Sequence, residues 1–183
     1  MTYLDVAAIR EDFPIFKRKM RNQSRLVYLD SGATTQKPLS VIDAELDFYQ
    51  NRNAAVHRGS YLLAEEANEA YENSRSTVAD FLGVAIDEVI FTKSATESIN
   101  LLSDSISNTP GFLKPGDEIL VSEMEHHSNI LPWQQLCVEK NAVLKVIPIS
   151  EEGELMLDEF NNLLSAKTKL VAIAHVSNTL GTI

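Results

Sequence analysis

The run Glu118-Ile119-Leu120-Val121-Ser122 is apolar at its centre and has the length of one buried strand. A polar loop at residues 123–129 follows it, and residues 130–140 then predict a helix whose first turn contains Pro132. A second apolar run at residues 143–149 completes a strand–helix–strand unit. Such units are typical of parallel sheets, so this stretch predicts an α/β fold.

The same alternation extends in both directions along the chain. We expect strands at residues 89–92 and 170–176, and helices at residues 95–106 and 157–165. Short strands separated by amphipathic helices indicate a mostly parallel sheet with helices on both faces. Upstream elements are expected as a helix at residues 4–12, a strand at 26–29, a helix after Pro38, a loop at 51–59 and a longer helix from Ser60 to Gly83.

Composition excludes several classes of function. Acidic residues outnumber basic ones by 26 to 16, giving a net charge of -10, which argues against a nucleic-acid-binding surface. Neither a secretory signal nor a membrane span is apparent, so we expect a cytoplasmic protein without membrane contact. The single cysteine, Cys137, rules out an intrachain disulfide and a multi-cysteine metal site, and we expect no metal.

Polar residues follow the predicted strand at residues 89–92. Ser94 and Glu97 have the spacing of a capping box, and helix capping alone would explain both. The alternative is an anion site, in which the N–H groups of the first turn and the Thr96 hydroxyl surround a phosphate. Both interpretations remain open. No dinucleotide or nucleoside-triphosphate loop motif is present.

Two further strand ends carry polar side chains. His126 and His127 are adjacent and cannot face the same way, so a shared metal is disfavoured. One interpretation is that both histidines are loop residues beside a helix cap. The other is that one imidazole ring lies against a planar cofactor and is available for proton transfer. After the last strand, Asn178 either shapes a turn through its own backbone or contacts a ligand.

Five runs of residues, taken together, form a recognisable pattern. The runs are Tyr28-Leu29-Asp30-Ser31-Gly32-Ala33-Thr34-Thr35-Gln36-Lys37-Pro38, Ala55-Val56-His57-Arg58-Gly59, Ala95-Thr96-Glu97-Ser98-Ile99-Asn100, residues 123–129 with Pro132-Trp133, and His175-Val176-Ser177-Asn178 with Leu180-Gly181-Thr182. This pattern resembles the class V aminotransferases, and more narrowly the SUF-system cysteine desulfurases and their selenocysteine-lyase relatives. The resemblance implies the large domain of the pyridoxal-phosphate (PLP) dependent transferases of fold type I. Residues 1–25 would form an N-terminal helix and arm, and residues 26–183 the N-terminal part of that domain.

The resemblance also implies cofactor contacts. Ala95 and Thr96 would bind the phosphate of PLP at a helix N-terminus. His126 would stack on the pyridine ring and assist proton transfer at the substrate carbon. Asn178 would hydrogen-bond the phenolic oxygen of the cofactor, with His175 close behind it.

Further roles follow from the same resemblance. Ser31, Gly32 and Ala33 would line the substrate pocket, whereas His57 and Arg58 would lie near a homodimer interface and the active-site entrance. The implied reaction converts L-cysteine, or L-selenocysteine, to L-alanine. The sulfur would form a persulfide on an enzyme cysteine and pass to an acceptor protein for iron–sulfur cluster assembly.

Three parts of the family pattern are missing from the sequence. The Schiff-base lysine, the aspartate that pairs with the pyridine nitrogen and the persulfide cysteine are expected beyond Ile183. Cys137 lies among apolar residues of a predicted helix and is interpreted as a buried structural thiol. Ser94-Ala95 also stands where SUF-type enzymes often carry Gly-Thr.

We therefore expect residues 1–183 to be an incomplete portion of the enzyme, inactive alone. The last predicted strand leads into a turn at residues 177–183 that points onward, so the sheet is expected to be unfinished. Two alternatives remain. One is another class V enzyme, kynureninase-like or epimerase-like. The other is a truncated protein without catalysis.

Overall fold

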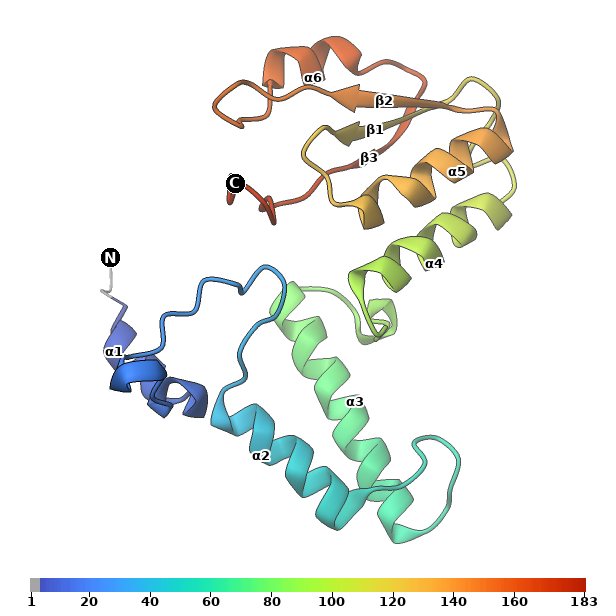
Figure 1. Cartoon of the computed structure of the whole chain (residues 1–183). Helices are drawn as coiled ribbons and strands as arrows, with labels where there is room; N and C mark the ends of the chain where they lie inside the picture. Colours follow the sequence, from blue (N-terminus) through green and yellow to red (C-terminus); the bar gives the residue numbers. More distant parts are fainter. Residues whose placement is uncertain (1–3) are drawn as a thin grey trace. The chain divides into compact units, whose positions relative to one another are not determined.

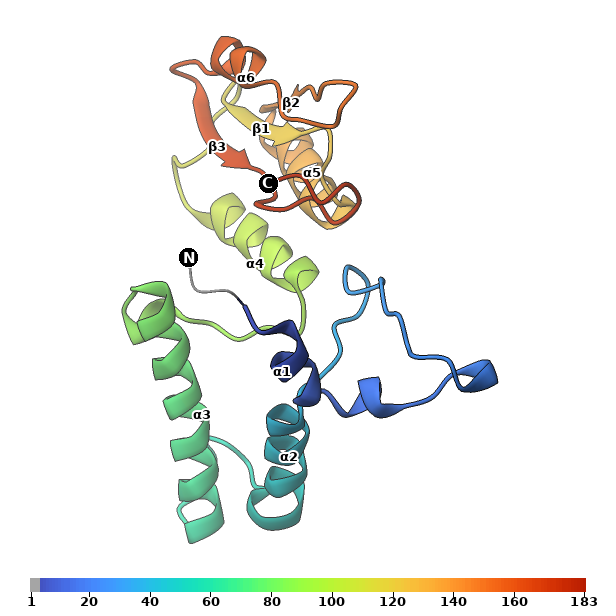
Figure 2. The same cartoon turned by 90° about the vertical axis from the view of Figure 1, so that its left-hand side faces the viewer.

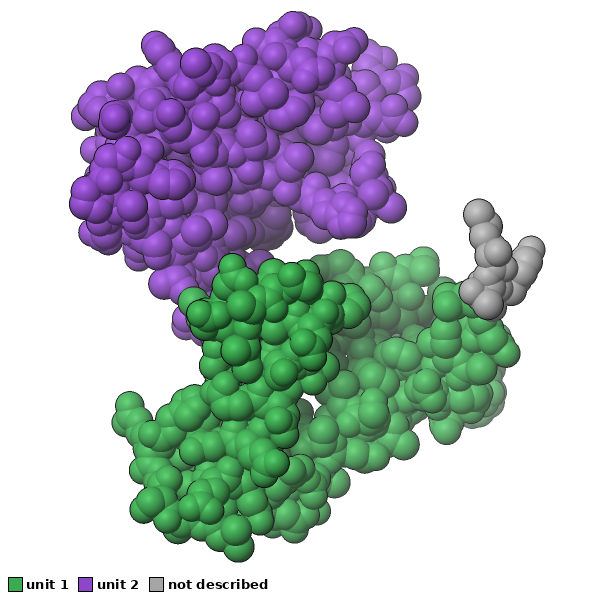
Figure 3. Space-filling model, turned by 180° about the vertical axis from the view of Figure 1, so that it is seen from behind, with its two compact units in different colours: residues 1–90 green, residues 91–183 purple. Residues whose placement is uncertain are grey.

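The chain forms two compact units in a computed structural model that describes residues 4–183 (Figure 1). The units are residues 1–90 and residues 91–183, coloured separately in Figure 3. The second unit contains the sheet and the helices that cover it. The domain division after residue 25 remains a prediction.

The sheet of the second unit has three parallel strands, β1 (Glu118–Ser122), β2 (Val143–Ile147) and β3 (Thr168–Ala172), in the order β2-β1-β3. All five residues of the central strand β1 are buried. A central parallel strand is covered on both faces, which explains why its central residues Ile119, Leu120 and Val121 are apolar in succession rather than alternating with polar residues. The predicted α/β class with a parallel sheet is confirmed.

Three helices pack around this sheet: α4 (Ala95–Asn108), α5 (Leu131–Lys140) and α6 (Leu157–Leu163). Helices α5 and α6 lie on opposite faces of the sheet (Figures 1 and 2), as predicted. The core beneath α4 and α5 is built from Ile106, Leu113, Ile119, Val121, Trp133, Leu136 and Cys137.

Cys137 is a core residue, as its apolar sequence context predicted. Its side chain is 4% exposed, and burial raises the pKa of the thiol. Because the thiolate is the nucleophilic form, a buried thiol with a raised pKa is a poor nucleophile. The interpretation of Cys137 as a structural residue is confirmed.

Helices α4 and α5 run side by side in the same direction. The Ser103 hydroxyl donates to the Pro132 carbonyl oxygen at 3.3 Å, and the Ser107 hydroxyl donates to the Glu139 carboxylate at 2.6 Å. Residues nearer the C-terminus of α4 therefore contact residues nearer the C-terminus of α5, so the two helices are parallel. The first turn of α4 consequently lies toward the same end of the unit as the loop that precedes α5.

Two predicted strands do not form. Residues 26–29 and residues 89–92 have no strand beside them within the described chain, and Leu29 is 93% exposed. A strand exists only where a neighbour takes its backbone hydrogen bonds, so apolar runs alone misled the prediction. The strand predicted at residues 170–176 is shifted, because β3 begins at Thr168 and ends at Ala172.

The first unit is helical within its described residues. Its helices are α1 (Val6–Glu11), α2 (Leu39–Asp47), the π-helical η3 (Phe48–Arg52) and α3 (Leu62–Leu82), with short 3₁₀ turns η1 (Pro14–Lys17), η2 (Arg21–Gln23) and η4 (Ile86–Glu88). Gly83 ends α3 with a φ of 70°, as predicted for a glycine cap. The apolar spacing of this helix also predicts Phe81 on its packed face, but Phe81 is 88% exposed.

No helix within residues 4–183 has the length and apolar character needed to cross a membrane.

The carboxylate of Glu118 receives three donors near the amino end of β1. These are Lys145 Nζ at 2.8 Å, the Ser165 hydroxyl at 2.7 Å and the Thr168 hydroxyl at 3.4 Å. The hydrogen bond from Lys145, followed by that from Ser165, lowers the pKa of Glu118. A carboxylate with a lowered pKa in the folded state stabilises the fold above the ordinary glutamate pKa of about 4.3, and this contribution is lost as the pH falls.

We therefore expect Glu118→Gln to lower the free energy of unfolding at neutral pH and to have a smaller effect at about pH 3, below the ordinary glutamate pKa. Urea unfolding of both proteins at the two pH values measures this. Glu151→Gln, an exposed carboxylate on the loop after β2, is the matched control and should change neither value. An equal loss at both pH values would contradict the ion-pair explanation.

Candidate active site

The N-terminus of α4 combines a helix cap with two unused donors. Ser94 Oγ accepts the N–H of Glu97 at 3.2 Å, and Glu97 Oε2 accepts the N–H of Lys93 at 2.7 Å. Capping therefore occurs, as the sequence predicted. Within residues 4–183 the N–H groups of Ala95 and Thr96 have no hydrogen-bond partner, and Thr96 is exposed. Two donors at the positive end of a 14-residue helix fit an anion such as a phosphate.

His126 is held by the short 3₁₀ helix η5 (His127–Asn129), against which α4 packs. The Nδ1 atom of His126 accepts the backbone N–H of Ser128 at 3.2 Å and lies 2.9 Å from the Ser128 hydroxyl. Because a backbone N–H can only donate, the neutral ring carries its proton on Nε2. His126 is therefore itself the cap residue of η5. Its exposed ring presents an Nε2–H donor.

The rings of His126 and His127 meet edge to face, with centroids 5.8 Å apart and planes at 79°. The two side chains thus face different directions. Within the described residues, no group of three or more His, Cys, Asp or Glu side chains could hold a metal ion.

Glu125, which the sequence did not single out, joins two strand ends. Its Oε1 atom accepts the Ser122 hydroxyl at 2.5 Å and the backbone N–H of Ala174 at 2.8 Å. Its Oε2 atom accepts the side-chain amide of Asn129 at 2.8 Å, and Asn129 Oδ1 accepts the indole N–H of Trp133 at 2.9 Å. The segment after β3 is therefore tied to the loop that carries His126. This bond also explains why β3 ends before residue 174.

The turn after β3 is built on Ser177 rather than on Asn178. Ser177 is 4% exposed, and its hydroxyl oxygen accepts the N–H of Leu180 at 3.1 Å. Its own N–H donates to the Thr182 carbonyl oxygen at 2.9 Å. The side chain of Asn178 is exposed and makes no hydrogen bond within residues 4–183. Of the two interpretations offered by the sequence, turn formation belongs to Ser177, which leaves the Asn178 amide available to a ligand.

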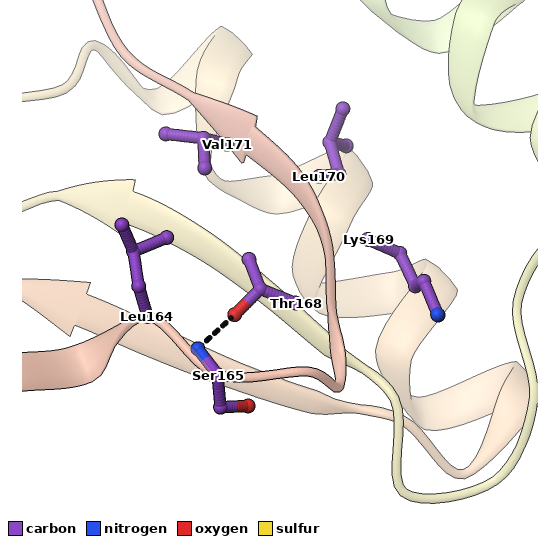
Figure 4. A pocket seen from close by; sticks show the side chains of 6 residues that line it. All are labelled: Leu164, Ser165, Thr168, Lys169, Leu170 and Val171. Atoms are coloured by element: carbon purple, nitrogen blue, oxygen red, sulfur yellow. Dashed lines mark hydrogen bonds between the residues drawn. The ribbon is translucent and has the colours of Figure 1, made fainter.

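A cavity of about 710 Å³ lies at the carboxyl ends of β1 and β3. Ser122, Ala174 and His175 are among the residues that line it. Ligands of open α/β sheets bind at this edge. Of the residues predicted to contact the cofactor, His175 lines this cavity, whereas Ala95, Thr96, His126 and Asn178 do not. A second, open hollow at the amino end of β3 is lined by Leu164, Ser165, Thr168, Lys169, Leu170 and Val171 (Figure 4).

The remaining predicted residues belong to the first unit. Ser31, Gly32 and Ala33 form a turn closed by the N–H of Ala33, which donates to the Asp30 carbonyl oxygen at 3.2 Å. Their assignment to a substrate pocket stays a prediction.

His57 and Arg58 lie in the loop between α2 and α3. His57 has a φ of 59°, and its Nε2 atom lies 2.9 Å from Glu72 Oε1. Its backbone N–H donates to the side chain of Asn68, so α3 holds this loop. Their roles at an interface and an entrance stay predictions.

Three comparisons place the chain among known proteins. The profile of the aminotransferase class-V family matches residues 27–183. A probable cysteine desulfurase of Staphylococcus epidermidis is 49% identical over 178 residues, which is 97% of this chain and 42% of that protein. The apo structure of a cysteine desulfurase from Thermococcus onnurineus superposes with a TM-score of 0.85 at 36% identity, covering 99% of this chain and 43% of that one.

A solved C-DES mutant with glycine covalently linked to its PLP cofactor shares the fold, with a TM-score of 0.70 at 18% identity over 92% of this chain and 41% of that one. The chain spans less than half the length of these relatives. The match to the family profile covers both units from residue 27 onward. The chain belongs to the class-V aminotransferase family, as its motifs predicted.

Proposed function

We propose that this chain contributes the cofactor-binding half of a PLP-dependent cysteine desulfurase. One observation carries the proposal. A single unit of the fold presents two first-turn N–H groups on α4 and an amide after β3 that are unpaired within residues 4–183, together with an oriented imidazole after β1. The high identity to proteins named cysteine desulfurase supports the same activity.

The described residues fit PLP by their chemistry. The N–H groups of Ala95 and Thr96, with the Thr96 hydroxyl, would bind the phosphate group. The exposed ring of His126 would lie against the pyridine ring, and the Asn178 amide would donate to the phenolic oxygen. His175, which lines the cavity at the same strand ends, would stand behind these contacts. When bound, PLP supplies an electron sink for the substrate carbon.

His126 is proposed to move the proton at the substrate carbon. Its Nδ1 atom is engaged by the Ser128 backbone, so the transferable proton sits on Nε2. Fixing one nitrogen in this way orients the ring and sets which atom faces the substrate. Ser128 therefore determines the tautomer of the proposed acid.

The proposed reaction balances without an external oxidant. L-Cysteine and an enzyme thiol yield L-alanine and an enzyme persulfide, with the sulfur transferred from the substrate to the thiol. Cys137 is not that thiol, because it is buried in the core. We assign the thiol, the Schiff-base lysine and the aspartate partner of the pyridine nitrogen to sequence outside residues 1–183.

The wider setting of this function is also proposed. We place the enzyme in the cytoplasm as a SUF-type homodimer that delivers sulfur to an acceptor protein for iron–sulfur cluster assembly. L-Selenocysteine is the second proposed substrate. Ser31, Gly32 and Ala33 would line the substrate pocket, and His57 and Arg58 would lie near the dimer interface and entrance.

Turnover of L-cysteine tests the function itself. The protein expressed from its complete natural reading frame, loaded with PLP, is expected to form L-alanine and, with a thiol reductant, an equal amount of sulfide. Both products are quantified from the same reaction. Turnover of L-kynurenine without turnover of L-cysteine would instead support a kynureninase-like hydrolase.

The phosphate contact gives a second test. Thr96→Val removes one hydroxyl donor and should weaken PLP binding by about tenfold, while binding of pyridoxal, which lacks the phosphate, stays unchanged. Equilibrium dialysis measures both affinities. Thr109→Val, at the other end of α4, is the matched control, because the Thr109 hydroxyl donates only to the Ser105 carbonyl oxygen, at 2.7 Å. Equal loss for both vitamers would contradict the phosphate assignment.

The third test concerns the proposed acid. His126→Gln should lower kcat for alanine formation by about 10²- to 10⁴-fold, because the proton on Nε2 is lost, while PLP remains bound. His127→Gln, the adjacent ring that faces another direction, should retain most activity. A fall of the same size in both variants would argue against a specific role for His126.

A further inference from the structure

Glu125 is the centre of a hydrogen-bond chain whose direction is fixed at one end. The indole of Trp133 has an N–H donor and no acceptor, so Asn129 must present its carbonyl oxygen to Trp133. The amide nitrogen of Asn129 then points at Glu125 Oε2. Trp133 is 1% exposed, so its buried ring fixes one end of this hydrogen-bond chain.

The other oxygen of Glu125 serves two more donors. Oε1 accepts the hydroxyl of Ser122, which is 3% exposed, and the backbone N–H of Ala174. Three donors thus converge on one carboxylate from the end of β1, the end of η5 and the segment after β3. Glu125 directly precedes His126, and Ala174 directly precedes His175.

We propose that Glu125 is the positioning residue of this site. It holds the His126 loop and the segment 174–178, which carries Asn178, in one fixed arrangement at the carboxyl ends of β1 and β3. The effect of Glu125 on PLP binding rests on the proposed function. The arrangement of the two segments rests on the hydrogen bonds alone. Glu125 acts through its neighbours and touches no reacting atom in this scheme.

The donor-to-acceptor direction of this hydrogen-bond chain predicts that two single variants each disrupt the site and that the double variant restores it. Glu125→Gln must place an amide N–H₂ group against either Asn129 or Ala174, both of which donate. Asn129→Asp must place two carboxylates against each other. In the double variant, the new amide at position 125 donates to the new carboxylate at position 129, which still accepts from Trp133. The amide oxygen at position 125 keeps the donors Ser122 and Ala174. Every donor again meets an acceptor, and the net charge is restored.

The test uses the protein expressed from its complete natural reading frame and four variants, with a fifth, Trp133→Phe, to assign one signal. These are Glu125→Gln, Asn129→Asp, the double variant and Glu123→Gln. The last is the matched control, since Glu123 lies in the same loop, is exposed and receives only a long contact of 3.4 Å from the Ile149 N–H. The readouts are PLP affinity, the visible circular dichroism of bound PLP, and the indole ¹⁵N–¹H signal of Trp133, assigned by its loss in Trp133→Phe.

We expect each single variant to weaken PLP binding by about tenfold or more and to shift the indole signal. The double variant should return within about threefold of the wild-type affinity with a native-like indole signal, and Glu123→Gln should behave as wild type. Additive losses in the double variant would overturn the proposal. So would a Glu125→Gln protein that is less stable yet keeps wild-type PLP affinity and dichroism, because the role would then be purely structural.

Failure of the proposed function has a different signature. A wild-type protein that binds no PLP refutes the cofactor assignment. The indole signal of Trp133 still reports whether the hydrogen bonds through Asn129 to Glu125 are formed. In that case rescue of the Trp133 signal in the double variant supports the positioning of the two segments, and its absence overturns it.

Discussion

The burial of β1 between two parallel neighbours is the constraint on which the second unit depends. Its backbone groups are paired on both edges, with β2 on one side and β3 on the other. Its side chains are covered on both faces, which requires a helix layer on each side of the sheet. Because all three strands point the same way, the loops that follow them emerge at one edge. The parallel arrangement is thus the reason that the polar segments after β1 and β3 lie together.

Much of this unit could be predicted from the sequence where the information is local. β1 has the predicted bounds, and α4 and α5 begin within one residue of their predicted starts. A capping serine and a proline in the first turn mark these starts through contacts with their immediate neighbours. Residues 26–29 and 89–92 were misread for the opposite reason. An apolar run becomes a strand only when another segment, distant in the sequence, pairs with it.

The residues of the candidate site likewise divide into those predicted from local sequence and those that depend on distant partners. The segment of the capping box directed attention to Thr96, and the polar strand ends directed it to His126 and Asn178, whereas the family resemblance added Ala95 and His175. Glu125 escaped notice because one of its main partners, Ala174, is 49 residues away in the sequence. A carboxylate just after a fully buried strand is a signal that could have found it, since such a group needs donors nearby. The role of Ser177 was not predicted, because the neighbouring Asn178 is a residue type that forms turns more often.

The spacing of the strand pairs also sets an order of assembly. Glu118 of β1 pairs with Val143 of β2, 25 residues on, but with Thr168 of β3, 50 residues on. Each doubling of a closing loop costs about 0.6 kcal/mol of chain entropy, so the shorter crossover through α5 is favoured to form before the longer one. We infer that β3 docks onto an existing β1–β2 pair. The bond between Ala174 and Glu125 joins the segments that follow β3 and β1, so the link between these two parts of the site depends on that docking.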